Sequence, residues 1–93
     1  MRRAAKVDTN QAAIVAALRQ AGYGVQSLAA VGGGCPDLLV AAGTRNVLLE
    51  VKRPKRGVFT SDQLRWWAAW PGELHVVRTP DEAAQAMRRR KCR

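Results

Sequence analysis

Apolar side chains recur along this chain with two different periods, and the first period predicts a helix near the start. In the stretch DTNQAAIVAALRQAG, residues 8–22, apolar positions at i, i+3, i+4 and i+7 form a single stripe suited to packing on a core. These positions are Ile14, Ala17, Leu18 and Ala21. Asp8, Thr9 or Asn10 can cap the start of this helix, and Gly22 can end it.

The second period is shorter and predicts strands. The stretch CPDLLVAAGTRNVLLEVKRPK, residues 35–55, contains two apolar strands joined by a turn at residues 43–46. A weaker alternation over residues 23–31 and the short run ELHVVR at residues 73–78 predict two further strands. The cluster VGGGCP between the first two strands is rich in chain breakers and is expected to be a loop.

Two more helices follow from capping signals. Thr60 and Gln63 fit a capping box before a helix at about residues 61–70, which a Pro-Gly pair ends. Thr79 can cap a last helix that has Pro80 in its first turn. The predicted order is α-β-β-β-α-β-α, a mixed α/β domain.

Length and charge narrow the function classes. The 93 residues suffice for one domain, with a core at about residues 8–87 and a basic tail at 88–93. Sixteen Lys and Arg against seven Asp and Glu give a net charge of +9, which favours a polyanionic partner over a membrane surface. Two cysteines without metal-type spacing favour a reducing cytoplasm. The start of the chain lacks the apolar region of a secretory signal.

Charged residues in the apolar hairpin are unexpected, because charges rarely enter a buried strand without a partner. Side chains alternate faces along a strand, so Glu50 and Lys52 share a face. A turn that pairs Gly43 with Asn46 would place Asp37 opposite Lys52. The three charged side chains are therefore expected to converge at one end of the hairpin, although a one-residue slip would separate them.

Two carboxylates brought together repel each other unless a cation lies between them. Oxygen ligands with open water positions suit Mg²⁺ or Mn²⁺, and a neighbouring lysine can orient a water or stabilise charge at a phosphorus centre. Asp37, Glu50 and Lys52 are thus compatible with metal-assisted phosphodiester hydrolysis. An ordinary ion pair between Lys52 and one of the acids is the alternative.

Three segments of the chain together resemble a known nuclease family. GGGCPDLLV, LLEVKRP and FTSDQLRWW resemble the VRR-NUC domain (virus-type replication-repair nuclease) of the PD-(D/E)xK superfamily, in the small stand-alone form carried by bacteriophages and prophages. Pro36-Asp37 matches the PD element, Glu50-Val51-Lys52 matches ExK, and Gln63 with Trp66 matches the following Q-x-x-W. The likeness covers nearly the whole chain.

The resemblance implies a PD-(D/E)xK, restriction-endonuclease-like core of order α-β-β-β-α-β, here with a C-terminal helix. It implies Mg²⁺, with Mn²⁺ as a substitute, held by Asp37, Glu50 and the backbone carbonyl of Val51. Lys52 would lie near the attacking water, and Gln63 would reach the active site, although its capping-box role needs no catalytic function. DNA would be the substrate, and small members resemble dimeric, structure-selective endonucleases that act on branched or junction DNA.

One departure from the family concerns the first helix, which usually offers a glutamate to the metal site. This helix has no glutamate, so Asp8, Asn10 or Gln11 could substitute, directly or through a water; otherwise the site holds fewer metal ligands. The departure keeps open a second reading, in which the chain is a non-catalytic DNA-binding module with the nuclease fold.

Two loops are candidates for DNA contact. Arg53, Lys55 and Arg56 in VKRPKRG could bind phosphates next to Lys52, or could simply be solvated. Gly33 and Gly34 could let the DNA backbone approach, or could only turn the chain.

The tryptophans of the second predicted helix suggest self-association. Trp66 and Trp70 can face inward, which leaves Trp67 pointing about 100° away, toward solvent or a second copy of the chain. Packing of Trp67 under the basic loop of its own chain is the alternative. We expect a homodimer in the cytoplasm of a bacterial or phage-infected cell.

Overall fold

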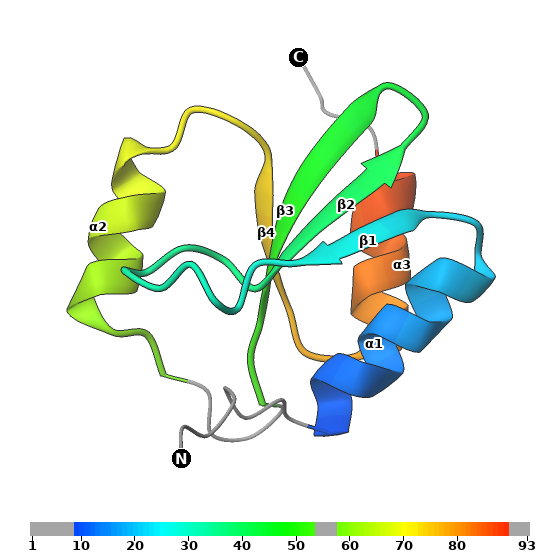
Figure 1. Cartoon of the computed structure of the whole chain (residues 1–93), viewed down its shortest axis with the longest axis horizontal. Coiled ribbons are helices and arrows are strands. Elements are labelled where there is room, and N and C mark those ends of the chain that lie inside the picture. Colours follow the sequence, from blue (N-terminus) through cyan, green and yellow to red (C-terminus); the bar gives the residue numbers. More distant parts are fainter. Residues whose placement is uncertain (1–8, 54–57, 90–93) are drawn as a thin grey trace.

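A computed structural model of the chain describes residues 9–53 and 58–89. Within these residues the element order is the predicted one, so the mixed α/β prediction is confirmed (Figure 1). The elements are α1 (Thr9–Gln20), β1 (Gly24–Ser27), β2 (Leu38–Ala42), β3 (Arg45–Val51), α2 (Ser61–Ala69), β4 (Leu74–Val77) and α3 (Pro80–Arg88). Thr60 and Thr79 cap α2 and α3 as expected. No helix in the described part of the chain is long and apolar enough to cross a membrane.

The four strands form one mixed sheet in the order β1-β2-β3-β4. β2 is antiparallel to both β1 and β3, whereas β4 runs parallel to β3. A parallel pair needs a crossover connection, which α2 provides. Figure 1 shows α1 and α3 on one side of the sheet and α2 on the other.

The hydrophobic core lies between the sheet and the α1–α3 side. Alternate residues of β2 and β3 point into it, and α1 and α3 supply the opposing side chains. The core includes Ile14, Leu18, Leu38, Val40, Val47, Leu49, Val51, Val77, Ala83, Ala86 and Met87. β3 is buried on both faces, because its other face, which carries Leu48 and Glu50, is also covered.

The register of the hairpin differs from the prediction by two positions. Ala42 pairs with Arg45, so the turn consists of Gly43 and Thr44 only, and the expected pairing of Gly43 with Asn46 is wrong. Gly43 has φ 65, a conformation that glycine adopts readily in a two-residue hairpin turn. A shift by an even number of residues keeps every side chain on its predicted face.

The layer formed by α2 is thin. α2 has no buried residue, and a cavity of about 340 Å³ separates Trp66 and Trp70 from the sheet. Trp66 and Trp70 stack on each other with ring centroids 4.7 Å apart. The expected outward position of Trp67 is wrong, because Trp67 is half-buried and packs edge-on against Phe59 of its own chain. The structure therefore removes the reason for placing a dimer interface at Trp67.

One arginine connects the hairpin to the end of α3. The Arg45 guanidinium donates to the backbone carbonyls of Ala86, Met87 and Arg89. The last carbonyls of a helix have no N–H partner within the helix, and these three lie at the end of α3. Arg45 also forms a two-point ion pair with Glu73, in which Nε donates to Oε1 at 3.1 Å and Nη2 donates to Oε2. Arg45 thus serves as a cap that α3 does not carry in its own sequence.

Candidate active site

Glu50 is the buried centre of the candidate site. It lies on the α2 side of β3 and is only 2% exposed. Its Oε2 accepts a hydrogen bond from Gln63 Nε2 at 2.9 Å and lies 3.7 Å from Lys52 Nζ. Its Oε1 is buried and has no hydrogen-bond partner. A buried carboxylate oxygen without a donor is costly, and such an oxygen is available to a ligand.

The electrostatic environment of Glu50 does not favour its charged form. Burial, together with the neighbouring charge of Asp37, raises the pKa of Glu50 from 4.5 to about 7. Lys52 acts in the opposite direction but does not compensate. A cation placed against both carboxylates would remove this penalty.

Asp37 reaches the same place from the end of β2. Continuing the observed register puts Asp37 opposite Glu50, and not opposite Lys52 as predicted. The Asp37 carboxylate accepts the Val51 N–H through Oδ2 at 2.9 Å. The predicted convergence of Asp37, Glu50 and Lys52 at one end of one face is therefore confirmed, with a different pairing.

Pro36 leaves the backbone carbonyl of Val51 without one hydrogen-bond donor, and this is the carbonyl that the family resemblance assigns to a metal. The N–H groups of Leu48 and Lys52 bond to β4, so the N–H and C=O of Val51 point to the β2 side. Continuing the observed register beyond its last pair puts Pro36 opposite Val51, and Pro36 has no N–H to donate to the Val51 carbonyl. The carbonyl thus lies beside the two acids without a donor from Pro36.

Gln63 completes the cap of α2 and also contacts Glu50 and Lys52. Its Oε1 accepts from the Thr60 N–H at 3.0 Å, and its own N–H donates to Thr60 Oγ1 at 3.1 Å, which completes the capping box. The same Oε1 accepts from Lys52 Nζ at 2.9 Å, while Nε2 donates to Glu50. One side chain therefore belongs both to the cap of α2 and to the surroundings of the acidic pair, Asp37 and Glu50.

Lys52 is held from three directions. In addition to Gln63, its Nζ donates to the Val58 carbonyl at 2.7 Å. It also lies 5.0 Å from the centroid of the Phe59 ring, within the range of a cation–π interaction. The ammonium group is thus fixed beside Glu50.

The first helix contributes a brace to the site. Asn10 Nδ2 donates to the Lys52 carbonyl at 2.9 Å and to the Arg78 carbonyl at 3.3 Å, which ties α1 to the end of β3. Gln11 is half-buried, and Asp8 lies outside the described residues. Within residues 9–53 and 58–89, no third His, Cys, Asp or Glu completes a side-chain group that could hold a metal. Further ligands would come from a backbone carbonyl or from water.

The predicted DNA-binding residues have different outcomes. Arg53 is exposed directly after Lys52, whereas Lys55 and Arg56 lie outside the described residues. Gly33 is exposed and has φ 67. Gly34 has φ 90, and a Cβ there would lie 2.4 Å from the backbone oxygen at residue 62, so packing against α2 already explains this glycine.

Sequence reasoning missed two residues beside the acids. Burial raises the pKa of the Cys35 thiol, and the charges of Glu50 and Asp37 raise it further, so Cys35 lies within their electrostatic reach. Arg78 Nη1 donates to the Arg53 carbonyl at 2.8 Å, which brings a second arginine to this end of the sheet. Arg78 could not be found from local spacing, because tertiary structure brings it in, whereas Cys35 lies only two residues before Asp37.

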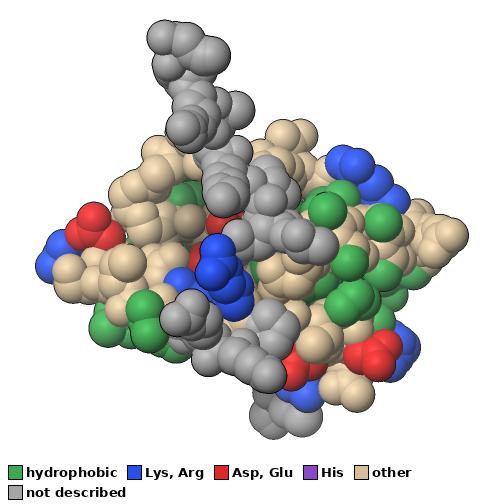
Figure 2. Space-filling view, turned by 90° about the horizontal axis from the view of Figure 1, so that it is seen from below, with side chains coloured by type: hydrophobic (Ala, Val, Ile, Leu, Met, Phe, Trp, Pro, Cys, Tyr) green, Lys and Arg blue, Asp and Glu red, His purple; other side chains and the backbone are tan. Residues whose placement is uncertain are grey.

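Figure 2 shows the molecule from the side where β3 ends; acidic side-chain atoms lie recessed at the centre, beside lysine or arginine atoms.

Comparison of the chain with family models, with curated proteins and with solved structures gives no match.

Proposed function

We propose that this protein is a metal-dependent DNA endonuclease that hydrolyses phosphodiester bonds and prefers branched or junction DNA. The observation that carries the proposal is the partnerless Oε1 of Glu50, buried beside a second carboxylate. An ordinary Lys52–Glu50 ion pair would not need Asp37 at the same point, and it leaves that oxygen without a donor.

The residues present fit a divalent ion such as Mg²⁺, with Mn²⁺ as a substitute. Asp37, Glu50 and the Val51 carbonyl would hold it, because all three offer oxygen to one end of the hairpin. When bound, such an ion supplies charge neutralisation and a water of lowered pKa. The raised pKa of Glu50 is consistent with a carboxylate whose partner is a cation.

Lys52 and Gln63 would act on the substrate side of the acids. The ammonium group of Lys52 can stabilise the negative charge that develops on a phosphate during hydrolysis. Gln63 fixes that ammonium group through Oε1 at 2.9 Å, so its orientation is set before substrate arrives. Gln63 thus positions Lys52 and Glu50 relative to each other.

The charge of the chain is the reason for proposing DNA. A net charge of +9 on 93 residues favours a polyanion, and phosphate neutralisation by Lys and Arg releases counterions. We expect the binding constant to fall with salt with a log–log slope of about −0.9 per phosphate contact on duplex DNA. An affinity that is unchanged between low and moderate salt would contradict a phosphate-contacting surface.

A cleavage assay tests the proposal. Duplex, flap and four-way-junction DNA are incubated with the protein in Mg²⁺, in Mn²⁺ and in EDTA. Asp37→Asn and Glu50→Gln should abolish cleavage and preserve folding and DNA binding, and Asp81→Asn, at an exposed position of α3, provides the matched control. Cleavage by either of these two variants at the wild-type rate would contradict the assignment of Asp37 and Glu50 to the active site.

We propose further that the working unit is a homodimer, since two sites would be needed to cut two strands of a junction. Sedimentation at micromolar concentration tests this. A species near 10.2 kDa would rule the dimer out, and one near twice that mass would support it.

The alternative is a non-catalytic DNA-binding module, and the first helix favours it. The side-chain amide of Asn10 donates to two backbone carbonyls and braces the fold. Asn10 therefore supplies no carboxylate in place of the glutamate found in the family that the chain resembles. This alternative predicts salt-dependent DNA binding without cleavage in any divalent metal.

A further inference from the structure

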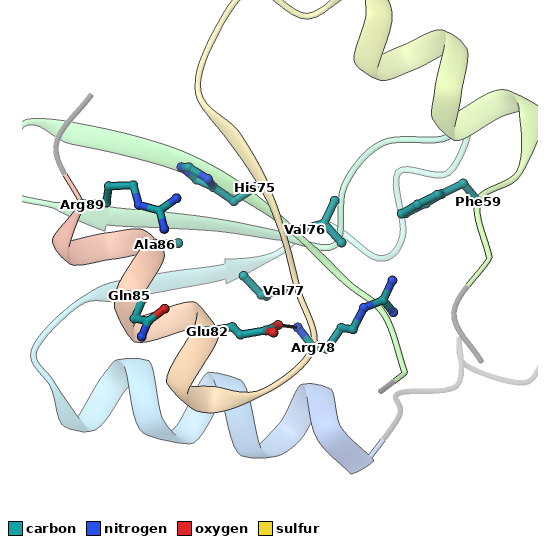
Figure 3. A pocket seen from close by; sticks show the side chains of 9 residues that line it. All are labelled: Phe59, His75, Val76, Val77, Arg78, Glu82, Gln85, Ala86 and Arg89. Atoms are coloured by element: carbon teal, nitrogen blue, oxygen red, sulfur yellow. Dashed lines mark hydrogen bonds between the residues drawn. The ribbon is translucent and has the colours of Figure 1, made fainter. Parts of the chain in front are cut away.

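A second surface of interest lies along the open edge of the sheet. A cavity of about 480 Å³ runs between β4 and α3. In Figure 3, Phe59 and Arg78 lie toward one end of this β4–α3 groove, and His75, Gln85 and Arg89 lie toward the other. The proposed catalytic residues do not line it.

The groove begins next to the acidic pair. Phe59, at one end, is the ring that lies 5.0 Å from Lys52 Nζ. Arg78, at the same end, donates through Nη1 to the carbonyl of Arg53, which directly follows Lys52. A strand of substrate that leaves Lys52 on this side would therefore enter the groove.

The charges that line the groove favour an anion. Arg78 and Arg89 are cations, and the acid among the lining residues is Glu82. Glu82 Oε1 accepts the backbone N–H of Arg78 at 2.6 Å, so this carboxylate is directed at the backbone (Figure 3). At the far end, His75 Nε2 is 2.9 Å from Glu73 Oε2.

The groove also offers an aromatic surface and backbone donors. Phe59 is 38% exposed as a residue, although its ring contacts Trp67 edge-on. The N–H groups of Leu48 and Lys52 bond to the carbonyls of Glu73 and Val77 on β4, so the backbone of the intervening Val76 points to the open edge. Arginines, an exposed ring and an outward N–H are the features that bind a single nucleic-acid strand.

We propose that the β4–α3 groove binds a single-stranded DNA arm that leaves the branch point beside the acidic pair. The inference rests on the proposed nuclease function and specifies its substrate. Phosphates contact Arg78 and Arg89, and an unpaired base stacks on Phe59. Bases in a duplex are already stacked on each other, so only an unpaired strand can make the Phe59 contact.

The test measures binding in EDTA, where cleavage does not occur, by fluorescence anisotropy with a labelled oligothymidine and with a blunt duplex. Arg89→Gln and Phe59→Leu are compared with Arg88→Gln. The control removes the same charge from the adjacent residue of α3, which does not line the groove. Because stacking of one base contributes about 1–3 kcal/mol, Phe59→Leu should weaken oligothymidine binding about tenfold.

Arg89→Gln should weaken oligothymidine binding severalfold, Arg88→Gln less than twofold, and duplex binding should change equally in Arg89→Gln and Arg88→Gln. Equal losses for Arg88→Gln and Arg89→Gln on oligothymidine would overturn the groove, as would wild-type binding by Phe59→Leu. A change in sedimenting mass without a change in binding would identify the β4 edge as a protein contact and would also overturn it. Since the readout is independent of metal, loss of the nuclease proposal in the cleavage assay leaves this result interpretable.

Discussion

Arg45 offers the sharpest test of how this small fold is held together. We consider Arg45→Met, which keeps much of the side-chain volume but removes the guanidinium. The change leaves the Glu73 carboxylate without its main partner and removes the donor from three carbonyls at the end of α3. Both groups are largely buried in the native state, since the Arg45 and Glu73 side chains are 27% and 15% exposed.

The expected magnitude follows from this partial burial. Breaking a fully buried ion pair by removing one partner costs about 3–5 kcal/mol, and an exposed pair contributes at most about 1 kcal/mol. A pair that is about one-fifth exposed lies between these limits, so we expect a loss of about 2–3 kcal/mol in the free energy of unfolding. For a domain of this size the loss corresponds to a fall in Tm of about 10–20 °C.

The pH dependence provides a second, independent measure. Hydrogen bonding from Arg45 lowers the pKa of Glu73 from 4.5 to about 2. A lowered folded-state pKa gives stability that is complete above the unfolded value and is lost as the pH falls toward 2. Linkage gives a total of about 3 kcal/mol, of which about 2 kcal/mol disappears between pH 7 and pH 3. Glu73→Gln should therefore be less stable than wild type at pH 7, and the difference should shrink by about 2 kcal/mol at pH 3.

Urea denaturation of wild type, Arg45→Met, Glu73→Gln and Arg65→Met at both pH values is the assay. Arg65 pairs with Asp62 on the surface of α2 and is 73% exposed, so Arg65→Met should change the free energy of unfolding by less than about 0.5 kcal/mol. A loss below about 1 kcal/mol for Arg45→Met, or a Glu73→Gln difference that does not depend on pH, would refute the reasoning.

Three further expectations concern the candidate site. Glu50→Gln should stabilise the metal-free protein by about 2–3 kcal/mol at pH 8 and by almost nothing near pH 4. Because the pKa of Glu50 is raised to about 7, the free-energy cost of burying its charged form grows as the pH rises from 4.5 through 7. Urea titrations that give the same difference at both pH values would contradict a buried, charged Glu50. Thr60→Ala and Gln63→Ala should each cost about 1 kcal/mol of stability as losses of a cap, but only Gln63→Ala should also reduce cleavage, by at least about tenfold; equal cleavage by both variants would limit Gln63 to capping. Gly34→Ala should cost more than about 1 kcal/mol in thermal unfolding, since the new Cβ meets the backbone at residue 62, and an unchanged Tm would show that α2 moves away freely.

The sequence allowed the elements to be predicted because their signals are local. The capping signals and the helical stripe depend on residues three or four positions apart, and both caps, Thr60 and Thr79, were found at the predicted positions. The faces of the hairpin were also predictable, since strand alternation is fixed by the chain itself. This was enough to bring Asp37, Glu50 and Lys52 together.

Features that depend on distant partners were not predictable in the same way. The register depended on whether Gly43 and Thr44 or Thr44 and Arg45 make the two-residue turn, and both choices satisfy the same apolar pattern. The position of Trp67 was set by its contact with Phe59, which lies eight residues earlier in the sequence, before α2 begins. The brace from Asn10 joins residues 42 and 68 positions apart, a distance over which no periodicity operates.

The absence of any buried residue in α2 has a consequence for the time course of the site. Native proteins open in cooperative units, and a unit with little buried surface opens at a lower free energy than the core. β3 belongs to the core unit, whereas Gln63 belongs to α2, so Glu50 and its amide partner belong to units of different stability. Native-state hydrogen exchange should therefore show the amides of α2 exchanging through a partial opening that leaves β3 protected. In that opened state Glu50 and Asp37 keep their positions at the sheet, whereas Gln63 moves away with α2. The acidic pair therefore persists for longer than the complete site that includes Gln63.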